Sequence, residues 1–555
     1  MARGGWLTKV IISRTVRLAA LVLCCAVFSL AMIRDLVVPF DGIAYEGGDP
    51  QDSGQMVWNL WHVADSVLHA KNPFETKRLY YPVGTNLAKH TLVSGFVPVT
   101  LLVQLLSGNH PLYPIYSFNI LVWLSYTLLL LLSYLTLRAL GFGVGVSIVP
   151  AIGFAFSDFY YLHATHLNLL AGFFMPLCAL LIIRLYQAPS RIRAVVAAVA
   201  LACAAYFTEL FVSILLALAI FGLAALVSKN TRPALLRLLR TLGRRTLIAS
   251  LLVFTGVLAP LLYEYVKCET LLPETMDYYR VSANLAGYVL PARHTTWLYG
   301  DLLLSLQEKV TTGFGGFEIF LGYPFLLCLV VGLFKPRARY HAGLLVAGMT
   351  FVILSLGPFL KVFNQDLPVP LPYTWLMRIP PFDQNRCPVR LATVAMFLFV
   401  PISAAGLSRI LAWVERHLAK TSSLAVWAAF LGWTVLETYS PVALTHGHFQ
   451  IPAKELAQLG PGPVTYLPLV EKPCAQAVLQ TLHGHPMTNG CLARHASKEL
   501  IWAGDLDRAF REDFSHYLAL LNQSGVKNII VVDEVAPDKL QALRSSGFNV
   551  VKVNR

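Results

Sequence analysis

Long apolar runs separated by short polar segments fill the first 440 residues of the chain. Twelve of these runs are about long enough for a helix to cross a lipid bilayer. They lie near 18–34, 92–107, 115–137, 145–161, 167–185, 194–209, 210–228, 247–266, 319–334, 342–362, 391–410 and 423–440. The run at 92–107 is the weakest, because it is short and contains Gly95 and Pro98. The pattern predicts a polytopic α-helical membrane protein with about 11–13 spans.

Composition supports this class, since 56% of the residues are hydrophobic and only 13% are charged. The net charge of +14 falls mainly in short segments between the runs, where it sets topology, so we do not expect nucleic-acid binding. The positive-inside rule places the N-terminus in the cytoplasm and the C-terminal part outside an inner (plasma) membrane. That arrangement needs an odd number of crossings, so we expect eleven, with 92–107 not crossing. We interpret the first run as a retained helix, because no signal-peptide cleavage site is clear.

The same orientation divides the chain into a transmembrane domain, 1–440, and an extracytoplasmic domain, 441–555. Three loops of the first domain are then outside, at 35–91, 267–318 and 363–390. In the second domain, Val464–Leu467 and Asn528–Val532 resemble buried strands separated by helical patterns, which predicts a small α/β fold. It contains no phosphate-binding glycine loop. Cys474 and Cys491 lie in this domain, and a disulfide between them is an open question.

The first outer loop carries several carboxylates directly after a predicted span, among them Glu46, Asp49 and Asp52. Such a loop has three interpretations: a solvated turn, a divalent-metal site or the site of a general base. The aromatic residues that follow favour a function, because their rings suit an interfacial belt or a sugar platform. These rings belong to Trp58, Trp61, Tyr80 and Tyr81.

Further polar residues lie at the predicted outer ends of spans, where burial is costly unless the group is paired or used. They are Asp158, His163, His166, Asn168 and Glu209. His163 and His166 are three residues apart and would share one face of a helix. With Asp158 they are candidate ligands for a divalent metal, although histidines that cap a span explain them as well. The cofactor therefore stays unknown.

Arginines occur on the predicted outer side in a proline-rich loop that ends with Arg386 and Arg390. A guanidinium group binds an oxyanion through two hydrogen bonds, so this loop suits a phosphate. Ordinary snorkelling to the headgroups is the alternative, but cations of that kind gather mainly on the cytoplasmic side. We therefore favour phosphate binding.

Together, these motifs resemble the GT-C superfamily of membrane glycosyltransferases, and in particular uncharacterised bacterial YfhO-like proteins. The resemblance lies in the order of the motifs along nearly the whole chain. The motifs are Gly48–Pro50, the tryptophan-rich helix, Asn72–Phe74, Tyr81–Gly84, His90, His166–Asn168, Ser282–Pro291, Glu318–Gly322, Arg386–Arg390, Gln480–Pro486 and Gly490–Arg494.

The resemblance implies an enzyme that moves a sugar from a polyprenyl-phosphate donor to an extracytoplasmic glycan, lipid or protein, with inversion. It assigns the general base to Asp49, with Glu46 or Asp52 in reserve. It assigns the stabilisation of the leaving phosphate to Arg386 and Arg390. The other candidate substrate-binding residues are Trp58, Trp61, Tyr81, His90, His163, His166 and Glu318. The first loop lacks the Asp-Glu pair and the Lys-Pro-Pro motif of better-known members, which leaves the acceptor open.

Two other functions are compatible with a polytopic chain of this kind. A transporter or flippase of a lipid-linked saccharide needs a polar path at the bilayer midplane, usually with an inverted repeat. The polar residues here lie at span ends and no repeat is clear, which favours the enzyme. A non-catalytic membrane protein of envelope assembly is the second alternative.

Overall fold

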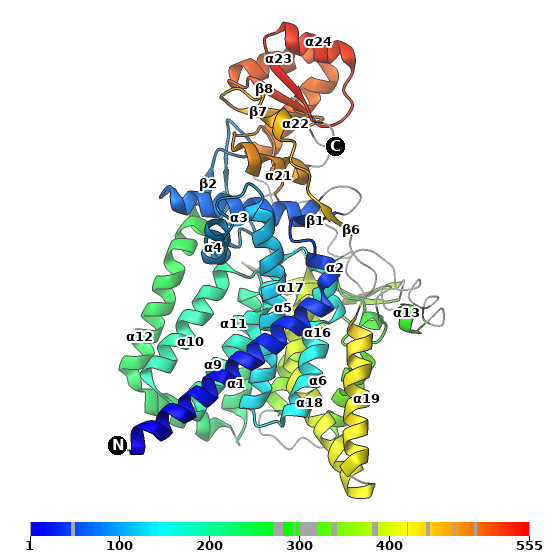
Figure 1. The fold of residues 1–555 in the computed structure, drawn as a ribbon. Helices are drawn as coiled ribbons and strands as arrows, with labels where there is room; N and C mark the ends of the chain where they lie inside the picture. The colour runs from blue at the N-terminus through cyan, green and yellow to red at the C-terminus, as the bar shows by residue number, and fades with distance from the viewer. Residues whose placement is uncertain are drawn as a thin grey trace.

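The computed structural model describes residues 2–45, 50–229, 231–269, 281–291, 296–299, 303, 306, 319–334, 341–363, 365–379, 387–418, 420–439, 445–469, 473–492 and 497–553. A bundle of long helices forms its lower part, and a smaller region with a sheet lies above it (Figure 1). The N-terminus lies at the lower end and the C-terminal strand at the upper end.

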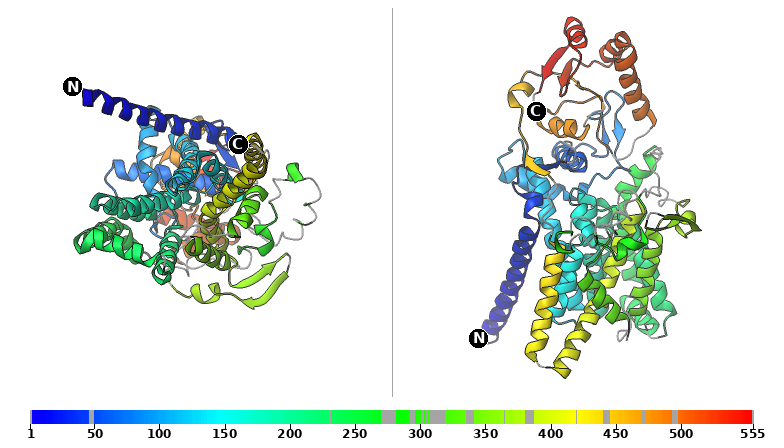
Figure 2. Two further views of the ribbon diagram at one scale, coloured as in Figure 1. Left: turned by 90° about the horizontal axis from the view of Figure 1, so that it is seen from below. Right: turned by 90° about the vertical axis from the view of Figure 1, so that its right-hand side faces the viewer.

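The bundle is built from apolar helices that occupy the predicted apolar runs. They are α1 (Ala2–Met32), α5 (Tyr113–Ala139), α6 (Val144–Ala155), α9 (Phe174–Gln187), α10 (Arg191–Cys203), α11 (Phe211–Val227), α12 (Arg232–Lys267), α15 (Tyr323–Leu333), α16 (His341–Ser355), α18 (Ala392–His417) and α19 (Lys420–Thr438). The first of these, α1, leans away from the others (Figures 1 and 2).

Short helices and ribbons connect these long helices. The helices are α2 (Arg34–Val37), η1 (Ser94–Phe96), α4 (Val97–Leu106), α7 (Asp158–Leu162), α8 (Leu167–Leu170), η2 (Ala171–Phe173), η3 (Ala204–Tyr206), η4 (Leu285–Tyr288), α13 (Thr296–Tyr299), α17 (Tyr373–Leu376) and η7 (Pro388–Leu391). Two antiparallel ribbons pair β2 (Glu75–Thr76) with β3 (Thr85–Asn86) and β4 (Phe359–Val362) with β5 (Gln365–Pro370).

Six described helical segments are long and apolar enough to cross a membrane, and four shorter helices are also apolar. The chain is therefore a membrane protein. Each predicted run contains a helix, but at 92–107 the helix is short, covering only Val97–Leu106 after one turn of 3₁₀ helix. Pro98 lies within its first turn, where proline is tolerated because the amide there has no partner in the helix. The number of crossings stays a prediction.

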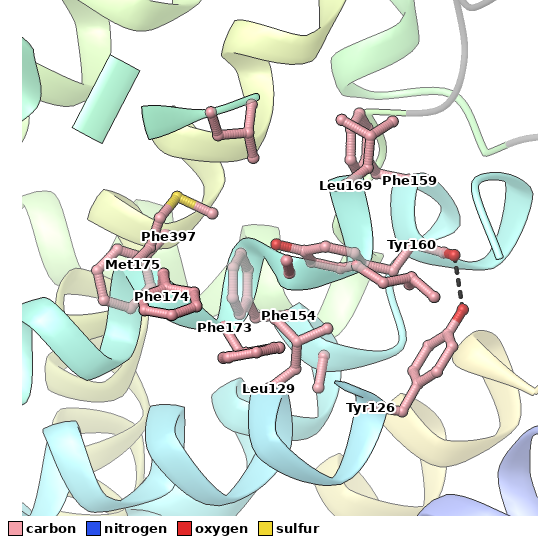
Figure 3. Packing of buried hydrophobic residues seen from close by; sticks show 14 of the residues in the cluster. Tyr126, Leu129, Phe154, Phe159, Tyr160, Leu169, Phe173, Phe174, Met175 and Phe397 are labelled. Atoms are coloured by element: carbon pink, nitrogen blue, oxygen red, sulfur yellow. Dashed lines mark hydrogen bonds between the residues drawn. The ribbon is translucent and has the colours of Figure 1, made fainter. Parts of the chain in front are cut away.

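The core of the bundle supports the loop that follows α6. Tyr160 is fully buried, and the Tyr126 hydroxyl donates a hydrogen bond of 2.6 Å to the Tyr160 carbonyl (Figure 3). A Cβ atom at Gly172 would lie 2.4 Å from the Tyr160 hydroxyl, so only glycine leaves room for this ring. Around it, Figure 3 shows Leu129, Phe154, Phe159, Leu169, Phe173, Phe174, Met175 and Phe397. The short helix α7 between two membrane helices is thus held in place by apolar packing.

The helix α3 (Gln51–Leu68) crosses the upper end of the bundle almost at right angles to the long helices (Figure 1). Most of its residues are buried, because it lies between the bundle and the upper region. Helix α21 (Pro473–His483) packs against it from above. This position brings the first turn of α3 to the surface of the bundle, where the site described below lies.

The upper region contains a three-stranded parallel sheet with β8 (Asn528–Val531) between β7 (Val464–Leu467) and β9 (Asn549–Lys552). Its other elements are α20 (Ala453–Leu456), α22 (Ser497–Glu512), α23 (Phe514–Gln523) and α24 (Pro537–Ser545). β7 and β8 occupy the predicted strand positions, and Cys474 and Cys491 form a disulfide. That this region is a separate domain stays a prediction. Strand β6 (Thr445–His448) pairs with β1 (Gly42–Tyr45) and so joins the upper region to the chain just before α3.

Candidate functional site

The first turn of α3 presents Asp52 at the upper surface of the bundle. The Ser53 hydroxyl donates a hydrogen bond of 2.6 Å to the Pro50 carbonyl, which fixes the chain where the helix begins. A carboxylate is stabilised at this position by the amides and the dipole of the helix N-terminus. The Asp52 side chain is 42% exposed, so it is accessible to a ligand.

His166 lies directly beside Asp52, with its Nε2 atom 3.0 Å from Oδ2 of the carboxylate. Its other ring nitrogen, Nδ1, is 3.2 Å from the Thr165 hydroxyl. A neutral His166 would donate its Nε2 proton to Asp52 and leave Nδ1 as the basic atom. The pair therefore has the form of a carboxylate that orients an imidazole.

Arg390 and Asn168 converge on the carboxylate of Glu209 from two other segments. The Arg390 guanidinium forms an ion pair with Oε1 of Glu209, and the Asn168 amide donates a hydrogen bond of 3.0 Å to Oε2. Only 21% of the Arg390 side chain and 20% of the Glu209 side chain are exposed. Arg390 is held by η7, where the Val389 amide donates to the Val281 carbonyl over 3.2 Å.

The two groups form one electrostatic unit. Burial alone raises the pKa of Asp52, but the charge and hydrogen bond of His166 and the charge of Arg390 outweigh burial and lower this pKa to about 2. The carboxylate is therefore ionised across the physiological range. Burial, with the charges of His166 and Arg390, holds the pKa of His163 well below its usual value, so the His163 ring is neutral.

A cavity of about 330 Å³ lies on the Arg390 side of this unit. Its polar lining includes Asn168, Glu209, Arg390, Lys89 and His90. Its apolar lining comes largely from α11 and α12, among them Phe211, Val212, Leu258, Leu261 and Leu262. Leu262 is itself 52% exposed on a bundle helix, so the cavity adjoins the outer surface of the bundle. A lining with both cations and many apolar side chains suits an amphipathic ligand.

Several predicted site residues lie outside the part of the chain that the structure describes. They are Glu46, Asp49, Glu318 and Arg386. Of the described ones, the structure brings together Asp52, His166 and Arg390, and it places His163 beside His166 with ring centroids 5.3 Å apart. The Tyr81 backbone amide donates to the Met487 carbonyl over 2.9 Å, so this residue lies against the upper region instead of the cavity.

The two tryptophans predicted as a sugar platform are buried in packing contacts. Trp58 is 1% exposed, stacks on His62 and donates a hydrogen bond of 2.6 Å to Gln480 of α21. Trp61 is 7% exposed, and the guanidinium of Arg78 lies 4.5 Å from its ring centroid. Neither indole has an open face for a sugar. The correction is physical: α3 lies beneath α21, so its aromatic face contacts protein.

The predicted metal ligands are not gathered. The described residues contain no group of three histidines, cysteines or carboxylates that could hold a metal. His163 ends α7 and His166 precedes α8, so the helix breaks between them and the expected shared face does not form. His163 Nδ1 contacts the Phe159 carbonyl at 2.8 Å, whereas His166 contacts Asp52. We therefore assign no metal to Asp158, His163 and His166.

Two residues of this unit had no predicted role. In the sequence, Glu209 and Asn168 are polar residues beside apolar runs, and Asn168 also belongs to the motif His166–Asn168. The structure gives both a role: Glu209 pairs with Arg390, and Asn168 donates a hydrogen bond to Glu209. Their separation of 41 positions from each other, and of 181 positions between Glu209 and Arg390, hides this from any local pattern.

No known family description matches the sequence, and no curated protein is similar to it. The fold is similar to that of a solved structure, the archaeal oligosaccharyltransferase AglB from Archaeoglobus fulgidus in complex with an inhibitory peptide and a dolichol-phosphate. The TM-score is 0.52 at 10% sequence identity, over 95% of this chain and 70% of AglB. At this identity the likeness concerns the fold, and it supports the GT-C-like architecture expected from the motifs. The narrower YfhO-like resemblance stays a prediction.

Proposed function

We propose that this protein is a membrane glycosyltransferase that moves a sugar from a polyprenyl-phosphate donor to a hydroxyl of an extracytoplasmic acceptor. The observation that carries the proposal is the convergence of Asp52, His166 and Arg390 beside one cavity at the surface of a GT-C-like bundle. The positive-inside rule makes this upper surface the extracytoplasmic one. The acceptor can be a glycan, a lipid or a protein.

The cavity is the proposed donor site. The lipid chain would lie against the leucines of α12, and the phosphate would lie beside Arg390. Glu209 neutralises Arg390 in the structure, so the phosphate would replace one carboxylate oxygen as its partner. Charge-assisted hydrogen bonds from a guanidinium group stabilise an anion strongly where water is scarce.

The Asp52–His166 pair is the proposed base. Asp52 would accept the Nε2 proton of a neutral His166 in a hydrogen bond and so orient the imidazole, and Nδ1 of His166 would accept the proton of the acceptor hydroxyl. The acceptor oxygen then forms a bond to the anomeric carbon. The bond from that carbon to the phosphate oxygen breaks, and its electron pair leaves with the lipid phosphate. A single displacement of this kind inverts the anomeric centre.

The base predicted from the motifs, Asp49, remains a proposal, because it lies outside the described residues. It precedes Asp52 by only three positions in the sequence. The dolichol-phosphate in the AglB structure supports a lipid phosphate as the donor of the present protein, and the peptide in that structure agrees with an acceptor outside the bilayer.

The proposal is tested with the full-length protein in proteoliposomes. The probes are polyprenyl-phosphate monosaccharides carrying glucose, mannose, galactose or arabinose, and the measurement is the release of free polyprenyl phosphate. We expect release by the wild type and none by His166→Gln. Movement of an intact lipid-linked sugar across the bilayer would instead identify a flippase. The whole panel is also tested with a membrane extract as the source of acceptor. If no probe then shows release of polyprenyl phosphate or movement across the bilayer, the proposal is overturned.

A further inference from the structure

The first part of α12, from Arg232 to Leu242, is amphipathic. At helical spacing, Leu235, Leu238, Leu239 and Leu242 fall on one side. Arg237 and Arg240 fall together on the opposite side, three residues apart, and both are exposed. Like charges at this spacing repel each other unless an anion lies between them.

This cluster has no acidic neighbour along the chain. No aspartate or glutamate occurs between Glu209 and Glu264, whereas this interval contains six cations. The cations are Lys229, Arg232, Arg237, Arg240, Arg244 and Arg245. Among the described residues, no ion pair involves Arg232, Arg237 or Arg240.

The exposed arginines surround a hollow of about 650 Å³ on the surface of the helix. Its lining consists of Arg232, Pro233, Leu236, Arg237, Arg240 and Thr241. Three guanidinium groups and a hydroxyl therefore face one concave surface. The positive-inside rule explains why cations lie on this side of the bundle, but it does not require them to line a single hollow.

The hollow lies at the lower end of the bundle, far from the candidate site. The upper end of α12 is marked by Lys267, which forms an ion pair with Glu75, so Arg232 lies at the opposite end. The backbone at Gly243 has φ 70° and ψ 160°, which interrupts the helix between its amphipathic part and its apolar part. Arg237 is also close enough to Tyr186, at the end of α9, for its charge to act on the phenol.

We propose that this hollow binds the headgroup of an anionic phospholipid in the lower leaflet. The guanidinium groups would bind the phosphate, as they do at other membrane surfaces, and the leucines of the same helix would contact the acyl chains. A membrane lipid suits the place better than a soluble phosphate, because only 11% of the apolar window of α12 is buried inside the protein. The site is separate from the proposed transferase site and does not depend on it.

The test uses the full-length protein in detergent with equal amounts of phosphatidylglycerol and phosphatidylcholine, and native mass spectrometry measures the lipids that stay bound. The variant is Arg237→Gln with Arg240→Gln. The control removes two exposed cations elsewhere at the lower end, Arg416→Gln with Lys420→Gln. We expect the first variant to lose phosphatidylglycerol affinity about thirtyfold, at about fivefold for each cation, and the control to keep it.

Equal losses in both variants, or no loss in either, would overturn the proposal, because the effect would then belong to the overall surface charge. Inorganic phosphate that displaces phosphatidylglycerol at millimolar concentration would also overturn it in favour of a soluble anion. If the variant does not fold, the lipid preference of the wild type still tests the proposal. Its preference for phosphatidylglycerol over phosphatidylcholine must be present at 50 mM salt and fall at 500 mM, since salt screens surface charges.

Discussion

The two halves of α3 each carry an aspartate that meets a histidine and an arginine. In the first turn, Asp52 contacts His166 and is attracted by the charge of Arg390. In the last turns, Asp65 forms an ion pair with Arg78, which also contacts His62 at 3.4 Å. The residue types are the same, yet the two groups differ in where their partners come from and in what surrounds them.

The second group is closed. His62 is 2% exposed, and both its ring nitrogens have partners, since Nε2 contacts the Pro73 carbonyl at 3.1 Å and Nδ1 contacts Arg78. The Arg78 guanidinium also covers the ring of Trp61. Above them, the Gln480 side chain accepts a hydrogen bond from the Trp58 indole and donates one of 2.7 Å to the Arg78 carbonyl. This group holds the upper region on α3, and its polar side chains are engaged with one another.

The first group is open. Its members come from three segments more than a hundred residues apart, and it borders a cavity instead of packed rings. Asp52 is 42% exposed, compared with 24% for Asp65. The comparison teaches that an aspartate, a histidine and an arginine in contact do not define a site. What distinguishes a candidate site is space next to them for a substrate.

The largest expected difference concerns transfer activity. Asp52→Asn should lower kcat by a factor of about 10² to 10⁴, because the imidazole loses the carboxylate that orients it. Asp65→Asn, made on the same helix, should change kcat by less than about threefold. The measurement is polyprenyl phosphate release by protein that elutes as a single species. Similar losses in both variants would show that the first group acts only through folding.

The next effect concerns the cation. Arg390→Gln should lower sugar transfer by a factor of about 10² to 10³, because the leaving phosphate loses its positive partner. Arg390→Lys should restore part of this loss by keeping the charge, although lysine binds only as a point charge. Binding of a polyprenyl phosphate without sugar should weaken in parallel. Unchanged binding in Arg390→Gln would place the phosphate elsewhere.

A smaller effect concerns stability. Here the order of the two variants is reversed, and the change at Asp65 should matter more than the change at Asp52. Asp65→Asn should lower the free energy of unfolding by about 2 kcal/mol, because it leaves the largely buried Arg78 without its ion partner. Asp52→Asn should cost much less, since that side chain is nearly half exposed. Thermal melting of both proteins in one detergent measures the difference. A larger loss for Asp52→Asn would contradict the assignment of the second group as structural.

The last effect is the response to acid. Burial and the charge of Arg78 lower the pKa of His62 from 6.5 to about 4. Between these values the unfolded chain binds a proton that the folded chain does not, so His62 makes stability rise with pH by up to about 1.4 kcal/mol per pH unit.

Replacing His62 by Gln should therefore flatten the dependence of the melting temperature on pH from 4 to 6.5. Asp52 acts in another window, because its lowered pKa removes its contribution only as the pH falls from about 4 toward 2. A slope in His62→Gln as steep as in the wild type would show that other groups cause the acid sensitivity.

Much of the architecture could be predicted because it depends on local pattern. Apolar runs predicted the bundle helices, since burying apolar surface in lipid or protein needs only composition and length. Val464–Leu467 was identifiable as a strand from its own residues. The same reasoning failed at His163 and His166, because α7 ends at Leu162 and α8 begins at Leu167, and at Trp58, because its partner Gln480 lies 422 positions away.

Composition and periodicity alone therefore determined that this is a helical membrane protein with polar residues at the ends of its helices. Which of those polar residues meet was decided by tertiary packing. Asp52, His166, Glu209 and Arg390 converge because α3 lies across the bundle and a buried tyrosine holds the loop after α6. Contacts between segments that far apart in sequence depend on the packing of every helix between them, and no local pattern encodes that.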